Sequence, residues 1–188
     1  MTSRFVYDID CSRSTWRLCL DGVQPPDRAY ALHELAGDFV FKPGDLDVCR
    51  IQLRTAIVAR GAKSEVLKTE AENVANSSSN GARAIRFLSW RFREIGPRKY
   101  WVAGALTIGD LSTVASLRID GPTPEISDRN GYVRAGAIAA TRIEGSPIRL
   151  ALDQSTYSKT STPARLLTLT FQIELVRRLP DVWMEAIA

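Results

Sequence analysis

The sequence predicts an all-β protein whose antiparallel strands close into a barrel, and three observations support this fold class. Apolar and polar residues alternate through much of the chain, which is the period of a strand rather than of a helix. Two alternating segments, 48–60 and 165–176, exceed the usual strand length, as expected for strands that tilt and curl around a barrel. The connections are mostly short, which favours an antiparallel meander or barrel over a parallel sheet with helices.

The individual strands follow from the same alternation. In 165–176 one face carries Leu167, Leu169, Phe171, Ile173 and Leu175, which predicts a strand with one dry face. Glycines at 37, 104 and 136 lie in or beside strands, where we expect bulges, bends or close packing. About nine or ten strands are predicted in all, the clearest of them at 5–9, 15–20, 48–60, 85–92, 100–108, 114–119, 132–141, 148–152 and 165–176.

Two segments depart from the strand pattern. Residues 62–75 are rich in helix formers and predict one inserted helix. A short C-terminal helical turn is expected after Pro180, because proline suits the first position of a helix. A Gly-Pro pair in 94–98 predicts a loop that interrupts strand pairing. With no internal repeat and no dividing linker, residues 1–188 are expected to form a single domain.

Composition excludes several classes of protein. The net charge is +4 and charges of both signs are mixed along the chain, which is typical of a solvated surface rather than a nucleic-acid-binding face. The stretch 83–100 interleaves arginines with aromatic residues, which suits single-stranded nucleic acid or two paired strands with exposed arginines and buried aromatics. Strand alternation favours the second interpretation, so no nucleic-acid partner is expected.

The cysteines and the apolar runs bear on location. Cys11, Cys19 and Cys49 are odd in number and show no disulfide framework, so three reduced thiols are expected. The first residues lack the apolar core of a secretory signal, and no run of apolar residues is long enough to span a membrane. We therefore expect a cytoplasmic protein with no integral membrane segment.

Residues for catalysis are few. His33 is the only histidine, and the sequence has neither a Gly-x-Ser-x-Gly elbow nor a glycine-rich phosphate loop. One histidine and three scattered cysteines offer no spacing that a zinc site uses. The sequence therefore predicts that the protein is not an enzyme and has no cofactor or metal, and an enzyme working through His33 is the least favoured alternative.

Five short motifs occur in a definite order along most of the chain. They are Tyr-Asp-Ile-Asp running into a small-residue turn in 7–16, Ala-Gly-Asp-Phe at 36–39, Ile-Arg-Phe-Leu-Ser within 84–89, Gly-Ala-Leu-Thr-Ile within 102–109, and the closing strand 170–176. In this order they resemble the YceI-like family of lipocalin-like barrels. Each motif is weak alone, and the five together are moderately specific.

The resemblance implies an elongated antiparallel lipocalin-like barrel with a helix inserted along its side. It also implies an interior tunnel for a long apolar chain, such as a polyisoprenoid, a fatty acid or a fatty amide, and no catalysis. Two departures concern the polar end of such a ligand. Arg13 stands where the family often has histidine, and 141–147 replaces the family's Asn/Asp-Arg-Ser-x-Phe-Gly segment.

The leading functional prediction is a non-enzymatic carrier that holds a long apolar molecule inside the barrel. The alternative is a protein-interaction or stress-related module with a solid core, since periodicity alone does not separate a packed core from a ligand-holding one. A homodimer is left open. An anionic headgroup could be met by Arg13 or Arg142. The candidate lining residues are Trp16, Leu18, Phe39, Ile51, Leu53, Phe87, Leu106, Leu169 and Phe171.

Overall fold

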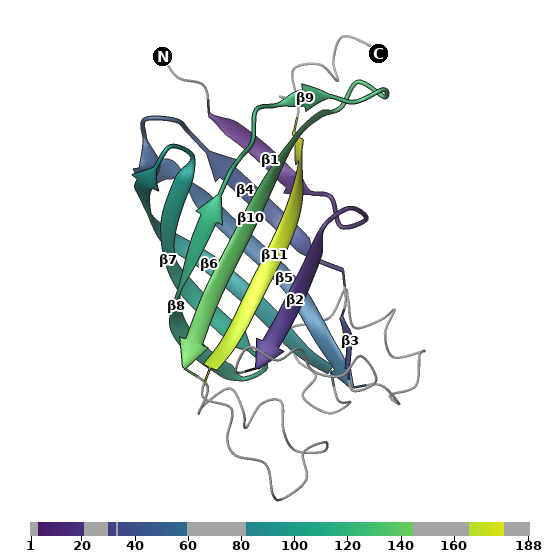
Figure 1. Ribbon diagram of the computed structural model, residues 1–188, viewed down its shortest axis with the longest axis vertical. Helices are drawn as coiled ribbons and strands as arrows, with labels where there is room; N and C mark the ends of the chain where they lie inside the picture. The colour runs from purple at the N-terminus through teal and green to yellow at the C-terminus, as the bar shows by residue number, and fades with distance from the viewer. Residues whose placement is uncertain (1–3, 21–29, 33, 60–81, 145–165, 179–188) are drawn as a thin grey trace, which may run out of the picture.

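The protein folds into one antiparallel β-sheet that curls into a barrel (Figure 1). A computed structural model describes residues 4–20, 30–32, 34–59, 82–144 and 166–178. Within these ranges, a single 3-10 turn, η1 (Leu46–Val48), accompanies the strands. The strands are β1 (Phe5–Ile9), β2 (Thr15–Leu20), β3 (Tyr30–Leu32), β4 (Ala36–Phe41), β5 (Arg50–Ala59), β6 (Ala82–Gly96), β7 (Lys99–Ile108), β8 (Leu111–Asp120), β9 (Ile126–Ser127), β10 (Val133–Glu144) and β11 (Leu166–Arg177).

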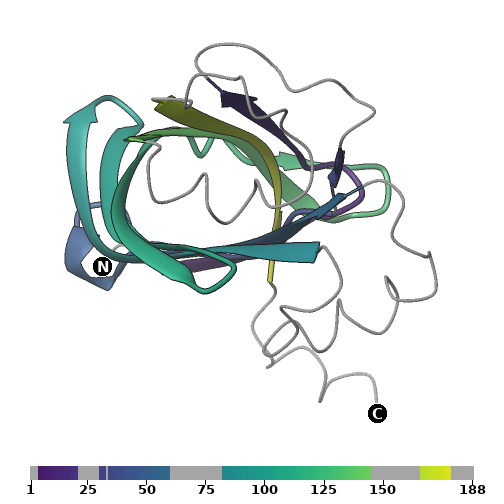
Figure 2. The ribbon, with the colours of Figure 1, turned by 90° about the horizontal axis from the view of Figure 1, so that it is seen from below.

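The barrel closes because its last two long strands pair with each other. The ring runs β11–β1–β4–β5–β6–β7–β8–β10, and β10 returns to β11 along a ladder from Arg134↔Val176 to Glu144↔Leu166. Viewed from below, these strands enclose a ring (Figure 2). The ladders differ in length: β1–β4 pairs only residues 5–8 with 38–41, and β8–β10 pairs only 118–120 with 138–140.

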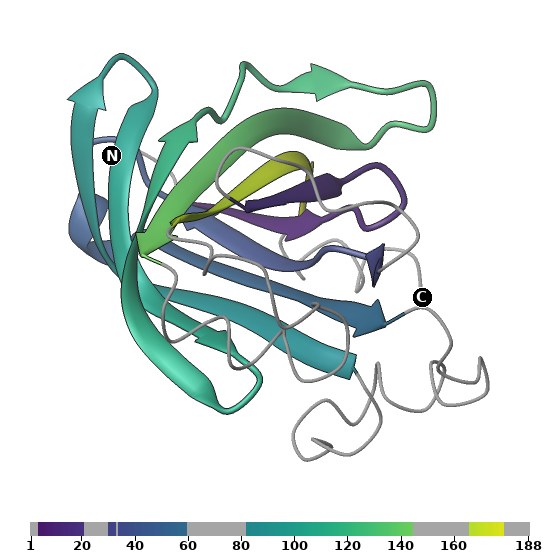
Figure 3. The ribbon, with the colours of Figure 1, turned by 60° about the horizontal axis from the view of Figure 1, so that its bottom comes forward.

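Three short strands prolong the wall. β2 continues along β11 where β1 leaves it, and β3 continues along β5 where β4 leaves it. β9 likewise pairs with β10 beyond the end of β8. Figure 3 shows β2 (dark purple) beside β11 (yellow). One long strand therefore supports two shorter partners in each case, which local periodicity does not reveal.

The predicted all-β barrel is confirmed, and several strand limits are extended. The strands predicted at 85–92 and 114–119 run to 82–96 and 111–120, while β3, β4 and β9 were not among the strands predicted. The loop predicted at 94–98 is shorter than expected. Glu94 pairs with Tyr100 and Gly96 with Lys99, with a register shift between them, and Pro97 with Arg98 (φ 56°) makes the turn. The helix predicted at 62–75, the strand at 148–152 and the helical turn after Pro180 lie outside the described residues.

Two glycines allow neighbouring strands to approach closely, as predicted. Gly37 has φ +144°, and a β-carbon there would lie 1.9 Å from the Gln52 carbonyl oxygen on β5. A β-carbon at Gly104 would lie 2.5 Å from the Leu88 carbonyl oxygen and from the Phe87 ring. Gly136 is different, because the nearest atoms to its β-carbon position are 3.8 Å away. Only the first two positions therefore require glycine for close packing.

A charge network joins the β1–β2 turn to the β9–β10 hairpin and β11. The Arg134 guanidinium donates to Asp10 Oδ2 at 2.7 Å and to Asp128 Oδ2 at 2.6 Å, and it lies 3.8 Å from Glu174 Oε1. Hydrogen bonds from Ser12 and then Arg134 lower the pKa of Asp10. The hydrogen bond from Arg134 likewise lowers the pKa of Asp128. Both carboxyls therefore stay ionised in the folded state below the pH at which they protonate when unfolded.

Acidification is expected to remove the contribution of this network. Because the folded pKa values of Asp10 and Asp128 are lowered, the unfolded chain binds more protons below about pH 4, and stability falls as pH falls. We expect Arg134→Met to be less stable than wild type at pH 7 and to differ less from it at pH 3. Urea midpoints at the two pH values measure this.

Arg178→Met is the control, since Arg178 pairs with Asp8 on an exposed surface where ion pairs contribute little. It should leave the midpoint nearly unchanged at both pH values. A deficit of Arg134→Met that is equally large at pH 7 and pH 3 would contradict the linkage.

Candidate functional site

The nine apolar residues predicted to line a ligand site all lie in one buried core. The exposed fraction of each is 5% or less. They also pair across neighbouring strands on the inner face, and the register shows this directly. The pairs are Phe39↔Ile51, Leu53↔Phe87, Phe87↔Leu106, Trp16↔Phe171 and Leu18↔Leu169. The structure thus settles which face of each strand points inward.

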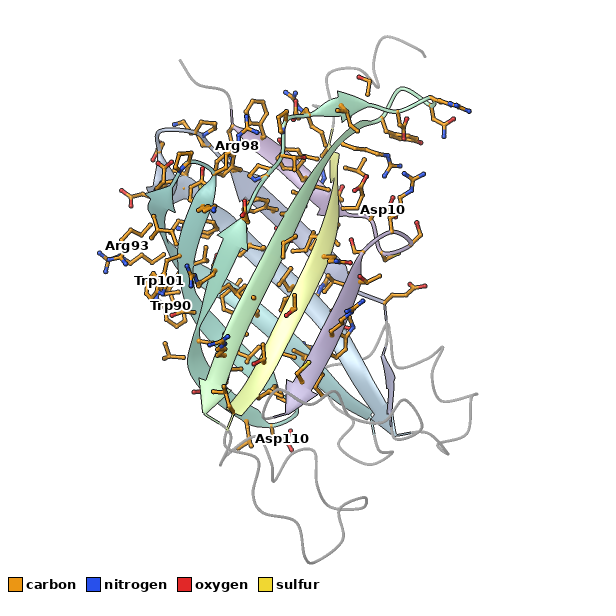
Figure 4. The ribbon with its side chains drawn as sticks, in the orientation of Figure 1. Asp10, Trp90, Arg93, Arg98, Trp101 and Asp110 are labelled. Carbon is orange, nitrogen blue, oxygen red and sulfur yellow. The ribbon has the colours of Figure 1, made fainter. Side chains whose placement is uncertain are left out.

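Aromatic rings fill the upper interior, at the end that carries the β6–β7 turn with Arg98 (Figure 4). Phe39 contacts Phe41 and Phe92, and Tyr100 contacts both of these in turn, with ring centroids 5.5–6.4 Å apart. Tyr7 adds a further ring against Phe39. Rings in offset or edge contact at these separations stabilise one another beyond simple burial. This part of the interior is therefore occupied by side chains of the protein.

The lower end of the barrel is the end that carries the β7–β8 turn with Asp110 (Figure 4). Toward this end, where β10 finishes, the interior contains a buried hydroxyl group, that of Thr141. Thr141 is only 3% exposed, and among the described residues its Oγ1 is buried without a hydrogen-bond partner. Thr141, on β10, pairs with Leu169 on β11, and Leu169 pairs in turn with Leu18 on β2. A buried hydroxyl without a partner is unfavourable. Among the described residues, the Thr141 hydroxyl is therefore a polar group in an apolar interior whose hydrogen-bonding capacity is not used.

Small side chains make up the inner face of β10 above Thr141. Ala135, Ala137 and Ala139 are all buried and alternate with outward-facing residues along the strand. They face Leu175, Ile173 and Phe171 on β11. Methyl groups on one strand against larger side chains on the next leave the β10 side of the interior as its least bulky wall.

The two arginines predicted for a headgroup lie elsewhere. Arg13 is exposed in the turn between β1 and β2, and Arg142 is exposed on the outer face of β10. Neither side chain points into the interior with the nine apolar residues. Both could reach only a headgroup that protrudes from the barrel, so their role at a polar end stays a prediction.

Groups with catalytic potential are sparse in the part of the chain that the structure describes. It contains no group of three or more His, Cys, Asp or Glu side chains that could hold a metal ion. His33 lies outside the described residues. The three cysteines are free, as predicted, and burial raises the pKa of Cys49, which keeps that thiol protonated. Burial, with the hydrogen bond from its hydroxyl to the Glu125 carboxylate, also raises the pKa of Tyr7.

Sequence reasoning missed Thr141 as a site residue, although it was the last residue of the strand predicted at 132–141. Alternation from Ala135 through Ala137 and Ala139 leads to Thr141 on the same face. This pattern predicts that the Thr141 hydroxyl lies in the interior of the barrel. Its apolar surroundings were not predictable in this way, because Leu169, which pairs with Thr141, and Leu18, which pairs with Leu169, come from distant segments.

Comparison with known proteins bears on the fold. No family model and no curated protein matches the sequence. A solved mutant of the Campylobacter jejuni YceI protein with a monobromobimane guest is 13% identical, with a TM-score of 0.52, over 84% of this chain and 89% of that chain. A second mutant of that protein gives the same values. Burkholderia cenocepacia BcnA is 17% identical, with a TM-score of 0.49, over 89% of this chain and 99% of that chain. At such identities, likeness concerns the fold alone.

Among the described residues, no helix is long and apolar enough to cross a membrane.

Proposed function

Because the chain has the YceI-like fold, we propose that it is a non-enzymatic carrier that holds a long apolar molecule in the lower interior of its barrel. Trp16, Leu18, Leu53, Leu169 and Phe171 supply apolar surface there. Ligand pockets are mostly apolar with a small number of polar groups that fix orientation. The inner surface of this barrel has that chemistry.

The observation that carries the proposal is the buried Thr141 hydroxyl, which has no hydrogen-bond partner among the described residues. An unpaired buried hydroxyl costs about 1–3 kcal/mol, so a fold that keeps one bears a cost that a ligand can offset. A threonine hydroxyl can donate one hydrogen bond and accept others through its two lone pairs. The ligand class that fits is a long hydrocarbon chain bearing a carbonyl, amide or hydroxyl group, such as a fatty acid, a fatty amide or a polyisoprenoid with an oxygen function.

A second candidate is favoured by the tight packing. The nine predicted lining residues are at most 5% exposed, so neighbouring atoms cover them on nearly all sides. In the solid-barrel alternative these side chains fill the interior permanently, and the protein acts through its outer surface. In the carrier proposal the lining side chains must repack around the ligand.

Extraction of the purified protein separates the two candidates. The carrier proposal expects a long-chain compound in organic extracts, identified by mass spectrometry, and binding of a fluorescent fatty acid such as cis-parinaric acid. Heat-denatured protein and an unrelated protein of similar size serve as controls. Absence of a co-purifying apolar compound together with absence of probe binding would overturn the carrier proposal and support the solid barrel.

Thr141→Val tests the polar anchor. Removing a buried hydroxyl without a partner should stabilise the ligand-free protein by about 1 kcal/mol. Losing the anchor should weaken binding of the fatty probe roughly tenfold, which corresponds to about 1.4 kcal/mol. Urea unfolding and probe titration measure the two effects.

Thr168→Val is the matched control, because Thr168 lies on β11 between the inward-facing Leu167 and Leu169 and so faces outward. It makes the same chemical change outside the barrel and should leave probe affinity unaltered. Equal probe affinity of Thr141→Val and wild type would remove Thr141 from the site.

We also infer a cytoplasmic location, supported by the free thiols. Cys11 is exposed and Cys49 is buried, and neither forms a disulfide. Unpaired cysteines are usual in a reducing compartment and uncommon in oxidising ones. Fractionation of cells that express the natural gene tests this inference, and recovery in an oxidising compartment would contradict it.

A further inference from the structure

The outer face of β6, β7 and β8 carries an exposed apolar surface, which we call the β6–β8 patch. It consists of the exposed Leu88, Trp90 and Val114 together with the half-buried Trp101 and Ala105. Leu88 is 55% exposed, Trp90 49% and Val114 72%. The register places Leu88 beside Ala105 and Ala105 beside Val114, so these three form a continuous row across the strands. Figure 4 shows Trp90 and Trp101 pointing away from the barrel.

A β-bulge adds Trp90 to this surface. The register of β6 against β7 shifts between Ser89, which pairs with Gly104, and Arg91, which pairs with Ala103. Trp90 is the extra residue, so Trp90 and Arg91 are both exposed while Ser89 and Phe92 are buried. Bulges commonly redirect a side chain in this way. The indole is thus held outside by the backbone itself.

Basic side chains lie on both sides of the apolar row. One neighbouring row across the strands holds Arg86, and the other holds Arg91, Ala103 and Ser116. The next row beyond Ala103 holds Arg93, Trp101 and Arg118. The Arg93 guanidinium lies 5.5 Å from the centre of the Trp101 ring, as in a cation–π contact. The exposed basic residues on these strands and turns are Arg86, Arg91, Arg93, Arg98, Lys99 and Arg118, and the exposed acidic ones are Glu94, Asp110 and Asp120.

We propose that the β6–β8 patch docks on anionic lipid bilayers. Tryptophan settles at the membrane–water boundary, and arginine keeps its charge near phosphates while its stem covers apolar surface. Aliphatic groups such as Leu88 and Val114 gain by entering the boundary between headgroups and acyl chains, and nearby cations are attracted to anionic lipids. The row of apolar side chains bordered by cations matches both demands.

Charge and chemistry argue against other occupants. Two copies of the patch would bring arginines against arginines, which like-charge repulsion disfavours. A nucleic acid would use the arginines and could stack on Trp90, but it offers nothing to the aliphatic side chains of Leu88 and Val114. A bilayer, unlike a nucleic acid, would also bury the side chains of Leu88 and Val114.

Vesicle flotation with the full-length chain tests the proposal. We expect binding to phosphatidylcholine vesicles that contain about a quarter phosphatidylglycerol, and roughly tenfold weaker binding to pure phosphatidylcholine vesicles. The double variant Trp90→Ser/Val114→Ser and the double variant Arg91→Gln/Arg93→Gln should each reduce binding roughly tenfold. Circular dichroism confirms that both remain folded, since all four side chains are on the surface.

Ile126→Ser is the matched control, because Ile126 is 66% exposed on β9, which pairs with β10 rather than with the patch. It should bind anionic vesicles like wild type. Equal binding of the Trp90/Val114 double variant and wild type would overturn the proposal, and so would equal binding to neutral and anionic vesicles. Tight binding of a single-stranded oligonucleotide that needs the arginines, without vesicle binding, would assign the patch to nucleic acid instead.

Discussion

Gly37→Ala is expected to destabilise the protein by on the order of 4 kcal/mol, a loss that only a short list of severe mechanisms produces. Gly37 has φ +144°, where a side chain is strained, and the new β-carbon would meet the Gln52 carbonyl oxygen at 1.9 Å. Relief requires β4 and β5 to separate, although both belong to the closed ring. Urea unfolding followed by tryptophan fluorescence measures the effect.

Gly44→Ala separates the clash from the backbone strain. Gly44 also has positive φ, +78°, but no atom lies within 4 Å of its β-carbon position. Its substitution should therefore cost only about 1 kcal/mol. Similar losses at the two positions would mean that β4 and β5 are not as close at Gly37 as the structure places them.

Leu169→Ala is expected to have the second large effect, lowering the free energy of unfolding by about 3–5 kcal/mol. Leu169 is fully buried between Leu18 on β2 and Thr141 on β10. Removing its branched end forfeits burial and leaves a cavity, because the closed wall limits how far neighbours can move inward. Chemical unfolding compares this variant with Val114→Ala, in which a 72% exposed side chain is shortened and stability should change by less than about 0.5 kcal/mol.

Leu169→Ala also tests how tightly protein atoms pack around this position in the barrel interior. A loss below about 1.5 kcal/mol at Leu169 would show that the neighbouring space is not packed with protein atoms. If the carrier proposal holds, the space left by Leu169→Ala adjoins the proposed anchor at Thr141. The fatty probe should then raise the unfolding midpoint of Leu169→Ala, and the solid-barrel candidate expects no such rescue.

Most of the barrel could be predicted from alternation, because a strand with one buried face leaves a period of two in the sequence. The strand at 165–176 shows this best, since its five alternating apolar residues are all buried in β11. The sequence alone did not fix which face of each strand points inward, and the structure buries all nine candidate lining residues. The YceI-like resemblance of the five motifs is confirmed at the level of the fold.

What could not be predicted depends on pairings between distant segments. The shared partners of β1 and β2, and of β3 and β4, are set by long-range register rather than by local residues. Trp90 is exposed because a bulge opposite Gly104 breaks the alternation. Thr141 became a candidate only when its surroundings on β2 and β11 were known. Arg13 and Arg142 were chosen for their charge, but Arg13 lies in the exposed turn between β1 and β2, and Arg142 faces outward between the buried Thr141 and Ile143.

The unequal ladders divide the barrel wall into two half-shells. β4 to β8 form one and β10 with β11 the other. On one side β1 joins them through short ladders to β4 and to β11, and on the other side β8 joins β10 through a short ladder. Within the half-shells, β7–β8 and β10–β11 pair along most of their lengths. Separating the strands at these junctions would break few backbone hydrogen bonds and leave the long ladders intact. We therefore expect the wall to open there first if the proposed ligand is too thick for the closed barrel.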